Sequence, residues 1–278
     1  MTAIDKRGDY PVRFAWARRF AWVGVLILGS LAYVLVLRTL TRTENLNFVP
    51  SLILLGSIVV PVTVLVFAAS GGRRIVAPTG MVVFTAIAGG VIGTVAAGTL
   101  EYDTLHTLGA LPMILVGLIE ESAKLIVPLL LLLVVRRPDP QSGVIIGVAS
   151  GMGFATLETM GYGFNALLSQ GNLAAVEQTL LLRALLSPAG HVAWTGLTVA
   201  ALWRIPSAAR KGRAVAVAAA AFVGAVLLHA AWDGSNSLVV HLLVGAFGIV
   251  ILLVMIHRSH RDPSRASHRR RRDAVHSS

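Results

Sequence analysis

The chain has 278 residues, of which 55% are hydrophobic and only 13% are charged, and its mean hydropathy is +0.76. A soluble globular protein carries roughly 25% charged residues, so this composition excludes a soluble domain and indicates an integral membrane protein. The absence of cysteine excludes disulfides, thiolate metal sites and cysteine nucleophiles. The net charge of +11 would suit a nucleic-acid-binding protein, but the positions of the basic residues argue against that function.

Apolar stretches of membrane-spanning length follow one another along the chain. A transmembrane helix needs about 20 mostly apolar residues, and breaker sequences such as "RRPDP" at 136–140 separate the stretches. We therefore predict an all-α polytopic fold, with a single membrane-embedded domain over residues 1–257 and a basic tail at 258–278. The predicted helices number about eight and cover residues 20–37, 50–69, 79–98, 110–135, 143–168, 179–203, 213–235 and 238–257.

Lysine and arginine are concentrated on one side of these helices. Both terminal tails and the loops at 70–78, 136–142 and 204–213 together hold 20 of the 24 basic residues. Because basic residues favour the cytoplasmic side, both termini are predicted to be cytoplasmic. We interpret the tail "SHRRRRDAVHSS" as an anchor for anionic lipids at the cytoplasmic face rather than as a nucleic-acid-binding arm. The predicted outer loops are 38–49, 99–109 and 169–178, and Glu101 and His106 are interpreted as loop residues without a special role.

Ionisable residues inside the predicted spans gather in four consecutive helices. A charged side chain near the bilayer centre costs at least about 2.5–3.5 kcal/mol, so these residues require a function. Counted along the helix axis, Glu120, Glu158 and His191 lie roughly 15–18 Å below the outer ends of their helices, with His229 shallower. This overlap in depth predicts one common site. The candidate catalytic residues are Glu120, Glu121, Glu158, His191 and His229, and the candidate supporting residues are Lys124, Phe154, Arg183 and Asp233.

Spacing within each helix adds detail to this site. Glu120 and Glu121 lie four and three residues before Lys124, so both pairs share a face, and the four-residue spacing favours Glu120 as the ion-pair partner. Phe154 lies one turn before Glu158 and is predicted to wall off the pocket. Arg183 is compatible with two interpretations, a supporting role or an extension of its side chain to the outer surface. In addition, Gly143, Gly147 and Gly151 form a small-residue face, predicted to contact the helix at 110–135 or the helix at 179–203.

Carboxylates and imidazoles in this combination suit hydrolysis by an activated water. Glu158, His191 and His229 are candidate ligands of a divalent metal, for which zinc is favoured, and the same residues also suit metal-free acid–base catalysis. Other membrane-embedded proteases fit poorly: the sequence contains no His-Glu-x-x-His motif, and an aspartyl protease needs two aspartates within the spans, where only Asp233 is available, near a helix end. "GVASG" at 147–151 has Val148 where a rhomboid-like serine motif needs glycine, so we interpret Ser150 as a packing residue.

Four short motifs resemble those of the PrsW family, which are bacterial multi-spanning proteases related to the CAAX prenyl proteases and the Abi group. The motifs are "EESAK" at 120–124, "FATLE" at 154–158, His191 before "AWTG", and "HAAWD" at 229–233, in order over a core of about 110–235. The resemblance implies an endopeptidase of the bacterial plasma membrane that cleaves single-span membrane proteins such as anti-sigma factors. It also implies that Glu120 and Glu121 form the catalytic pair, with Glu120 slightly favoured as the base, and it leaves metal dependence open. Asp233 stands where relatives often have asparagine.

Two other functions are compatible with the same residues. Chains of glutamate, histidine and aspartate in spans are also typical of proton-coupled transporters, although the sequence shows no internal repeat of the kind that many transporters contain. A non-catalytic membrane chaperone with a relic site is the third hypothesis.

Overall fold

The computed structural model describes residues 15–70, 77–135 and 138–259 of the chain. These residues form helices, and no β-strand occurs among them, which confirms the predicted all-α class. In chain order the elements are α1 (Ala15–Thr43), a short 3₁₀ turn η2 (Leu46–Phe48), α2 (Val49–Ser70), α3 (Thr79–Leu108), α4 (Met113–Val134), α5 (Ser142–Gln170), α6 (Leu173–Leu186), a π-helical turn η3 (Pro188–Val192), α7 (Ala193–Leu202), α8 (Lys211–Gly234) and α9 (Leu238–Ser259).

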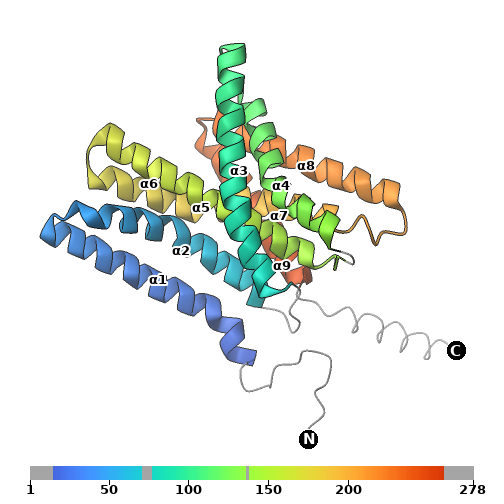
Figure 1. The fold of residues 1–278 in the computed structure, drawn as a ribbon, viewed down its shortest axis with the longest axis horizontal. Coiled ribbons are helices and arrows are strands. Elements are labelled where there is room, and N and C mark those ends of the chain that lie inside the picture. Colours follow the sequence, from blue (N-terminus) through green and yellow to red (C-terminus); the bar gives the residue numbers. More distant parts are fainter. Residues whose placement is uncertain (1–14, 71–76, 136–137, 260–278) are drawn as a thin grey trace, which may run out of the picture.

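Local sequence sets several helix ends. α3 ends at Gly109 and α5 ends at Gly171, both in the left-handed conformation with φ of 68° and 64°, a conformation that glycine adopts without steric penalty. Asn172 then caps α6, since its side chain accepts a hydrogen bond from the backbone N–H of Ala175 at 2.9 Å. The α5–α6 hairpin therefore turns sharply, which places α6 against α5 (Figure 1).

α5 is the central helix of the molecule. α1, α2, α5 and α6 run side by side, α3 runs at a steep angle to them and packs on α5, and α4, α7, α8 and α9 lie on the other side of α3 in this view (Figure 1). The glycine face of α5 contacts the segment η3–α7: a Cβ on Gly147 would stand 2.8 Å from the Cα of Gly196, and one on Gly151 would stand 2.6 Å from the carbonyl oxygen of His191. Of the two predicted partners, the structure thus selects the helix at 179–203.

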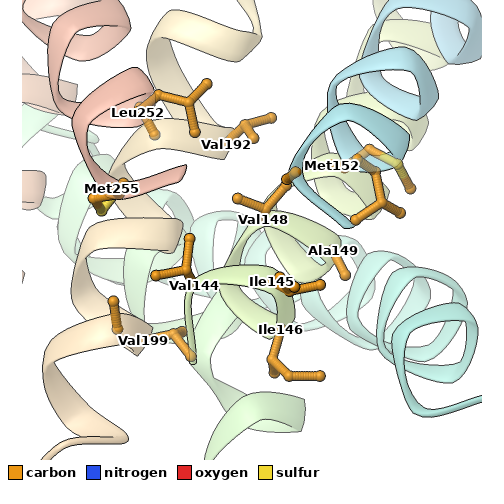
Figure 2. Packing of buried hydrophobic residues seen from close by; sticks show 14 of the residues in the cluster. Val144, Ile145, Ile146, Val148, Ala149, Met152, Val192, Val199, Leu252 and Met255 are labelled. Carbon is orange, nitrogen blue, oxygen red and sulfur yellow. The ribbon is translucent and has the colours of Figure 1, made fainter. Parts of the chain in front are cut away.

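Apolar side chains of α5 fill the space that its glycines leave. Figure 2 shows Val144, Val148 and Met152 interleaved with side chains from the neighbouring helices, including Val192 and Leu252. The exterior is also apolar, especially along α1, whose most hydrophobic stretch has no buried residue. A protein surrounded by lipid is expected to be apolar on its exterior as well as in its core.

Among the residues that the structure describes, seven helical segments are long and apolar enough to cross a membrane: Ala17–Thr43, Leu46–Ser70, Thr79–Leu108, Ser142–Gln170, Leu173–Leu202, Lys211–Gly234 and Leu238–Ser259. The chain is therefore a polytopic membrane protein. The remaining predicted span corresponds to α4, which has 22 residues but carries Glu120, Glu121 and Lys124 in its middle. These charges set α4 apart from the other seven.

Several sequence-based predictions about individual elements are wrong. The loops predicted at 38–49 and 169–178 are partly helical, because α1 continues to Thr43 and α6 begins at Leu173. The helix predicted at 179–203 is broken: Pro188 lacks a backbone N–H, Gly190 has non-helical dihedral angles, and the N–H of Val192 reaches back five residues to the carbonyl of Ser187 at 3.4 Å. The helix predicted at 79–98 continues to Leu108, so the polar residues predicted to form a loop at 99–109 are helical, with Asp103 and His106 exposed and Glu101 partly buried. The basic tail at 258–278 lies almost wholly outside the described residues, as do most of the N-terminal tail and the Arg-containing parts of the loops at 70–78 and 136–142.

Candidate active site

The structure brings the five candidate catalytic residues together in one cluster. Glu120 and Glu121 come from α4, Glu158 from α5, His191 from the π-helical turn η3, and His229 from α8. Glu120, Glu121 and His229 are buried, with exposed fractions of 7%, 2% and 1%. The cluster is thus a polar centre enclosed by apolar helices.

Lys124 lies at the middle of this cluster and is fully buried. Its ammonium donates hydrogen bonds to Glu121 Oε1 at 2.7 Å and to Glu120 Oε2 at 3.1 Å, and it lies 2.7 Å from His191 Nδ1. The ring of Phe154 packs against the same ammonium, with its centroid 4.3 Å from Nζ. Spacing alone favoured Glu120 as the lysine's partner, whereas the structure shows that Lys124 bridges both glutamates and lies closer to Glu121.

His229 is held between carboxylates. Its Nδ1 lies 2.9 Å from Glu121 Oε1, and its Nε2 lies 3.0 Å from Asp233 Oδ2 and 3.5 Å from Glu120 Oε2. An N–H on Nδ1 donates to Glu121, and an N–H on Nε2 would donate to Asp233, while Glu120 Oε2 lies slightly farther from Nε2. A carboxylate that orients an imidazole through its far N–H is a common support for a metal ligand.

His191 shows the same arrangement with its nitrogens exchanged. Its Nε2 lies 2.9 Å from Glu158 Oε2, and its Nδ1 faces Lys124 and lies 4.0 Å from Glu120 Oε2. With the proton on Nε2, this ring faces Glu158 with its N–H, and its Nδ1 accepts a hydrogen bond from the Lys124 ammonium. Both imidazoles thus converge on Glu120, each oriented by a different glutamate.

Glu120, His191 and His229 could hold a metal ion. One ligand atom from each lies within 4.8 Å of the other two, and ligands of tetrahedral zinc stand about 3.4 Å apart, so small side-chain shifts would close the shell. Charge also favours a cation, because the four carboxylates of the site face only two permanent cations, which leaves a formal charge of −2 when both imidazoles are neutral. The carboxylate in this group is Glu120; Glu158, the predicted ligand, contacts the opposite nitrogen of His191.

Arg183 turns inward rather than toward the outer surface. Its guanidinium lies 2.7 Å from Glu158 Oε2 and stacks over the ring of Tyr162 at 3.8 Å. Arg183 therefore neutralises the carboxylate that orients His191. Ser150 donates a hydrogen bond to the backbone carbonyl of Lys124 at 2.7 Å and is fully buried, as expected of a packing residue.

A cavity of about 240 Å³ opens beside this cluster. Polar and charged side chains of the site line it together with apolar ones from α6 and aromatic ones from α7 and α8. The lining residues include Glu158, Arg183, His191, Asp233, Leu186 and Trp232. The cavity gives a ligand access to Glu158, His191 and Asp233, behind which the more deeply buried Glu120 and His229 lie.

Two residues near the site were missed in the sequence. Glu101 was assigned to a loop, but it belongs to α3, its Oε1 is buried without a hydrogen-bond partner in the described part of the chain, and its charge interacts with those of Glu120 and Glu158. Trp194 follows His191 by three residues, and its ring centroid lies 5.9 Å and 5.3 Å from those of His191 and His229. Only the position of Trp194 in "HVAWTG" could have indicated it.

Comparison with known proteins agrees with this geometry. No match was found among curated proteins or among solved structures. The sequence profile described as "PrsW family intramembrane metalloprotease" matches residues 60–257, well over half of the chain, and the matched region contains every residue of the cluster. The chain therefore belongs to the PrsW family of intramembrane metalloproteases.

Proposed function

We propose that this protein is an endopeptidase that hydrolyses peptide bonds of single-span membrane proteins, with proteins of the anti-sigma-factor type as the substrates that family resemblance suggests. The observation that carries the proposal is the convergence of Glu120, His191 and His229 in a buried cluster next to a cavity. A site enclosed by membrane-spanning helices suits a substrate that is itself in the membrane.

Glu120 is the proposed general base. Its Oε2 is the carboxylate oxygen toward which both imidazoles converge, and it takes a proton from water as the oxygen of that water attacks the scissile carbonyl carbon. The same proton then passes to the leaving nitrogen as the carbon–nitrogen bond breaks. Glu121 and Glu158 orient His229 and His191, while Lys124 offsets the glutamate charges.

In the metal-dependent version of the proposal, Glu120 is a ligand rather than a free base: Glu120, His191 and His229 hold a divalent ion, with zinc favoured by the mixed nitrogen and oxygen donors. When such an ion is bound, it supplies Lewis-acid polarisation of a carbonyl and a more acidic water. The chain's own contribution is to fix the ligand orientation through Glu121 and Glu158 and to exclude bulk water with Phe154.

In the proposed membrane topology α4 is an eighth span. At 1.5 Å per residue its 22 residues reach about 33 Å, enough for a hydrocarbon core of about 30 Å. Its three charged residues face the buried cluster rather than lipid, which reduces their insertion cost. Eight spans place both termini on the same side, and the basic residues favour the cytoplasm of a bacterial plasma membrane, with anionic lipids against the basic tail.

Purified protein in liposomes with a single-span substrate tests the proposal. Cleavage of the substrate that a chelator abolishes and zinc restores is the expected result. Proton or ion flux without cleavage would instead favour a transporter, and stabilisation of the substrate without cleavage or flux would favour a chaperone.

A further inference from the structure

Two residues that line the cavity beside the catalytic cluster carry buried N–H groups without acceptors among the described residues. Trp194 is 2% exposed and lines the cavity, and its indole Nε1 has no hydrogen-bond partner within the described chain. Arg183 lines the same cavity, and its Nε is likewise buried and unpaired among those residues, although its terminal nitrogen pairs with Glu158. Buried donors without partners are rare in folded proteins, so two in one cavity indicate a ligand with acceptor oxygens.

Trp194 lies next to the catalytic imidazoles, so an acceptor for its indole N–H would also lie near them. Its ring packs against both catalytic imidazoles, at 5.9 Å from His191 and 5.3 Å from His229 between ring centroids. A ligand atom that accepts from its indole N–H therefore lies close to the scissile bond. Trp203, the other buried tryptophan with an unpaired indole nitrogen in the described region, does not line this cavity.

We propose that Trp194 is a substrate-binding residue, whose indole N–H donates a hydrogen bond to a backbone carbonyl of a substrate segment lying in the 240 Å³ cavity. The proposal rests on the protease function proposed above. The Arg183 Nε–H is the second donor for the same segment.

This contact restricts the class of substrate. In the interior of an intact transmembrane helix each carbonyl already accepts a hydrogen bond from its own chain and is flanked by the side chains of the next turn, so it is a poor acceptor for Trp194. The bound segment must therefore be unwound at the cavity. Glycine or proline near the scissile bond lowers the helix stability of that segment, so substrates with such residues are cleaved in preference to substrates with leucine there.

The matched pair Trp194→Phe and Trp203→Phe tests the proposal. Each change removes one unpaired indole N–H and keeps an aromatic ring, so their effects on folding are comparable. In liposomes, Trp194→Phe is expected to raise KM for a single-span substrate roughly three- to tenfold with little change in kcat, as the loss of one hydrogen bond formed equally in the bound and transition states predicts. Trp203→Phe is expected to leave both constants unchanged. An unchanged KM in Trp194→Phe, or an equal rise in Trp203→Phe, would overturn the proposal.

A second measurement uses the unaltered protein and does not depend on how the variants fold. In a series of synthetic substrates, one backbone amide at a time is replaced by an ester, whose carbonyl is a weaker acceptor. At one position, the ester is expected to raise KM with the wild-type protein but not with Trp194→Phe. Such non-additive effects are expected when the two altered groups contact each other directly. Additive effects at every position contradict the contact. If wild type and Trp203→Phe cleave no substrate at all, the protease function itself fails, which is distinct from cleavage that is insensitive to Trp194.

Discussion

Glu120 and Glu121 are adjacent in the chain, yet their side chains have different surroundings. Glu121 is fixed by close contacts with Lys124 and His229, whereas Glu120 lies at the point where both imidazoles converge. We expect Glu120→Gln to lower the cleavage rate by about 100- to 10,000-fold, as loss of a general base does. Glu121→Gln keeps an oxygen that accepts from both partners, so a smaller loss of about 10- to 100-fold is expected. Rates in liposomes measure both, and wild-type cleavage by Glu120→Gln would contradict its assignment as the base.

Lys124 and a metal ion would share acceptors at this site, because the ammonium contacts Glu120 Oε2 and His191 Nδ1. Lys124→Met is therefore expected to retain bound zinc, while His229→Ala loses a ligand and lowers zinc affinity about 10- to 100-fold or more. Zinc content of the purified proteins, each folded by the same spectroscopic criterion, checks this. Negligible zinc in all of them, with wild-type cleavage in the presence of chelator, would exclude the metal and leave Glu120 to act on water alone.

At the scale of single elements, the π-helical turn η3 is the feature that positions His191. It packs on Gly151 of α5, where an added Cβ would meet the carbonyl oxygen of His191 at 2.6 Å. Gly151→Ala is therefore expected to displace the turn, to lower cleavage at least about tenfold and to destabilise the protein by about 1–3 kcal/mol. Gly161→Ala on the same helix is the control, since nothing lies within 4 Å of its added Cβ. Equal cleavage and thermal stability of both variants would show that the close packing at Gly151 does not set the position of His191.

Hydropathy and the depth of residues along each span predicted which helices exist and which carry the site better than they predicted where helices end or break. The four polar helices were identified because charge in an apolar segment is costly, and counting residues placed Glu120, Glu158 and His191 at similar depth. The break at Pro188 and Gly190 was missed because the flanking residues are apolar enough to read as one helix. The orienting roles of Glu121 and Glu158 depend on how helices are rotated against one another, which spacing within one helix does not determine.

At the scale of the whole molecule, acidic and basic residues indicate different properties. The buried carboxylates mark the candidate site, and most of the basic residues indicate how the chain is oriented in the membrane. The buried cluster contains carboxylates from α4, α5 and α8 with Lys124 and Arg183, while the other basic residues fall near predicted helix ends and in predicted loops. The residues of the site come from short motifs on separate helices. The site can therefore assemble only if α4 crosses the membrane beside α5 and α8. The orientation of these spans is therefore a testable condition for the proposed site.

The absence of cysteine allows single introduced cysteines to report this orientation. Gln170 and Ser207 are both exposed, and they lie just before and just after the kinked span Leu173–Leu202. Because basic residues flank the Ser207 side, Gln170→Cys is expected to react with an impermeant maleimide in intact cells and Ser207→Cys only after permeabilisation. The reverse pattern would place both termini outside. Labelling of both cysteines from the same side would mean that the segment carrying His191 does not cross the membrane, and the four-helix site could not then form at the proposed depth.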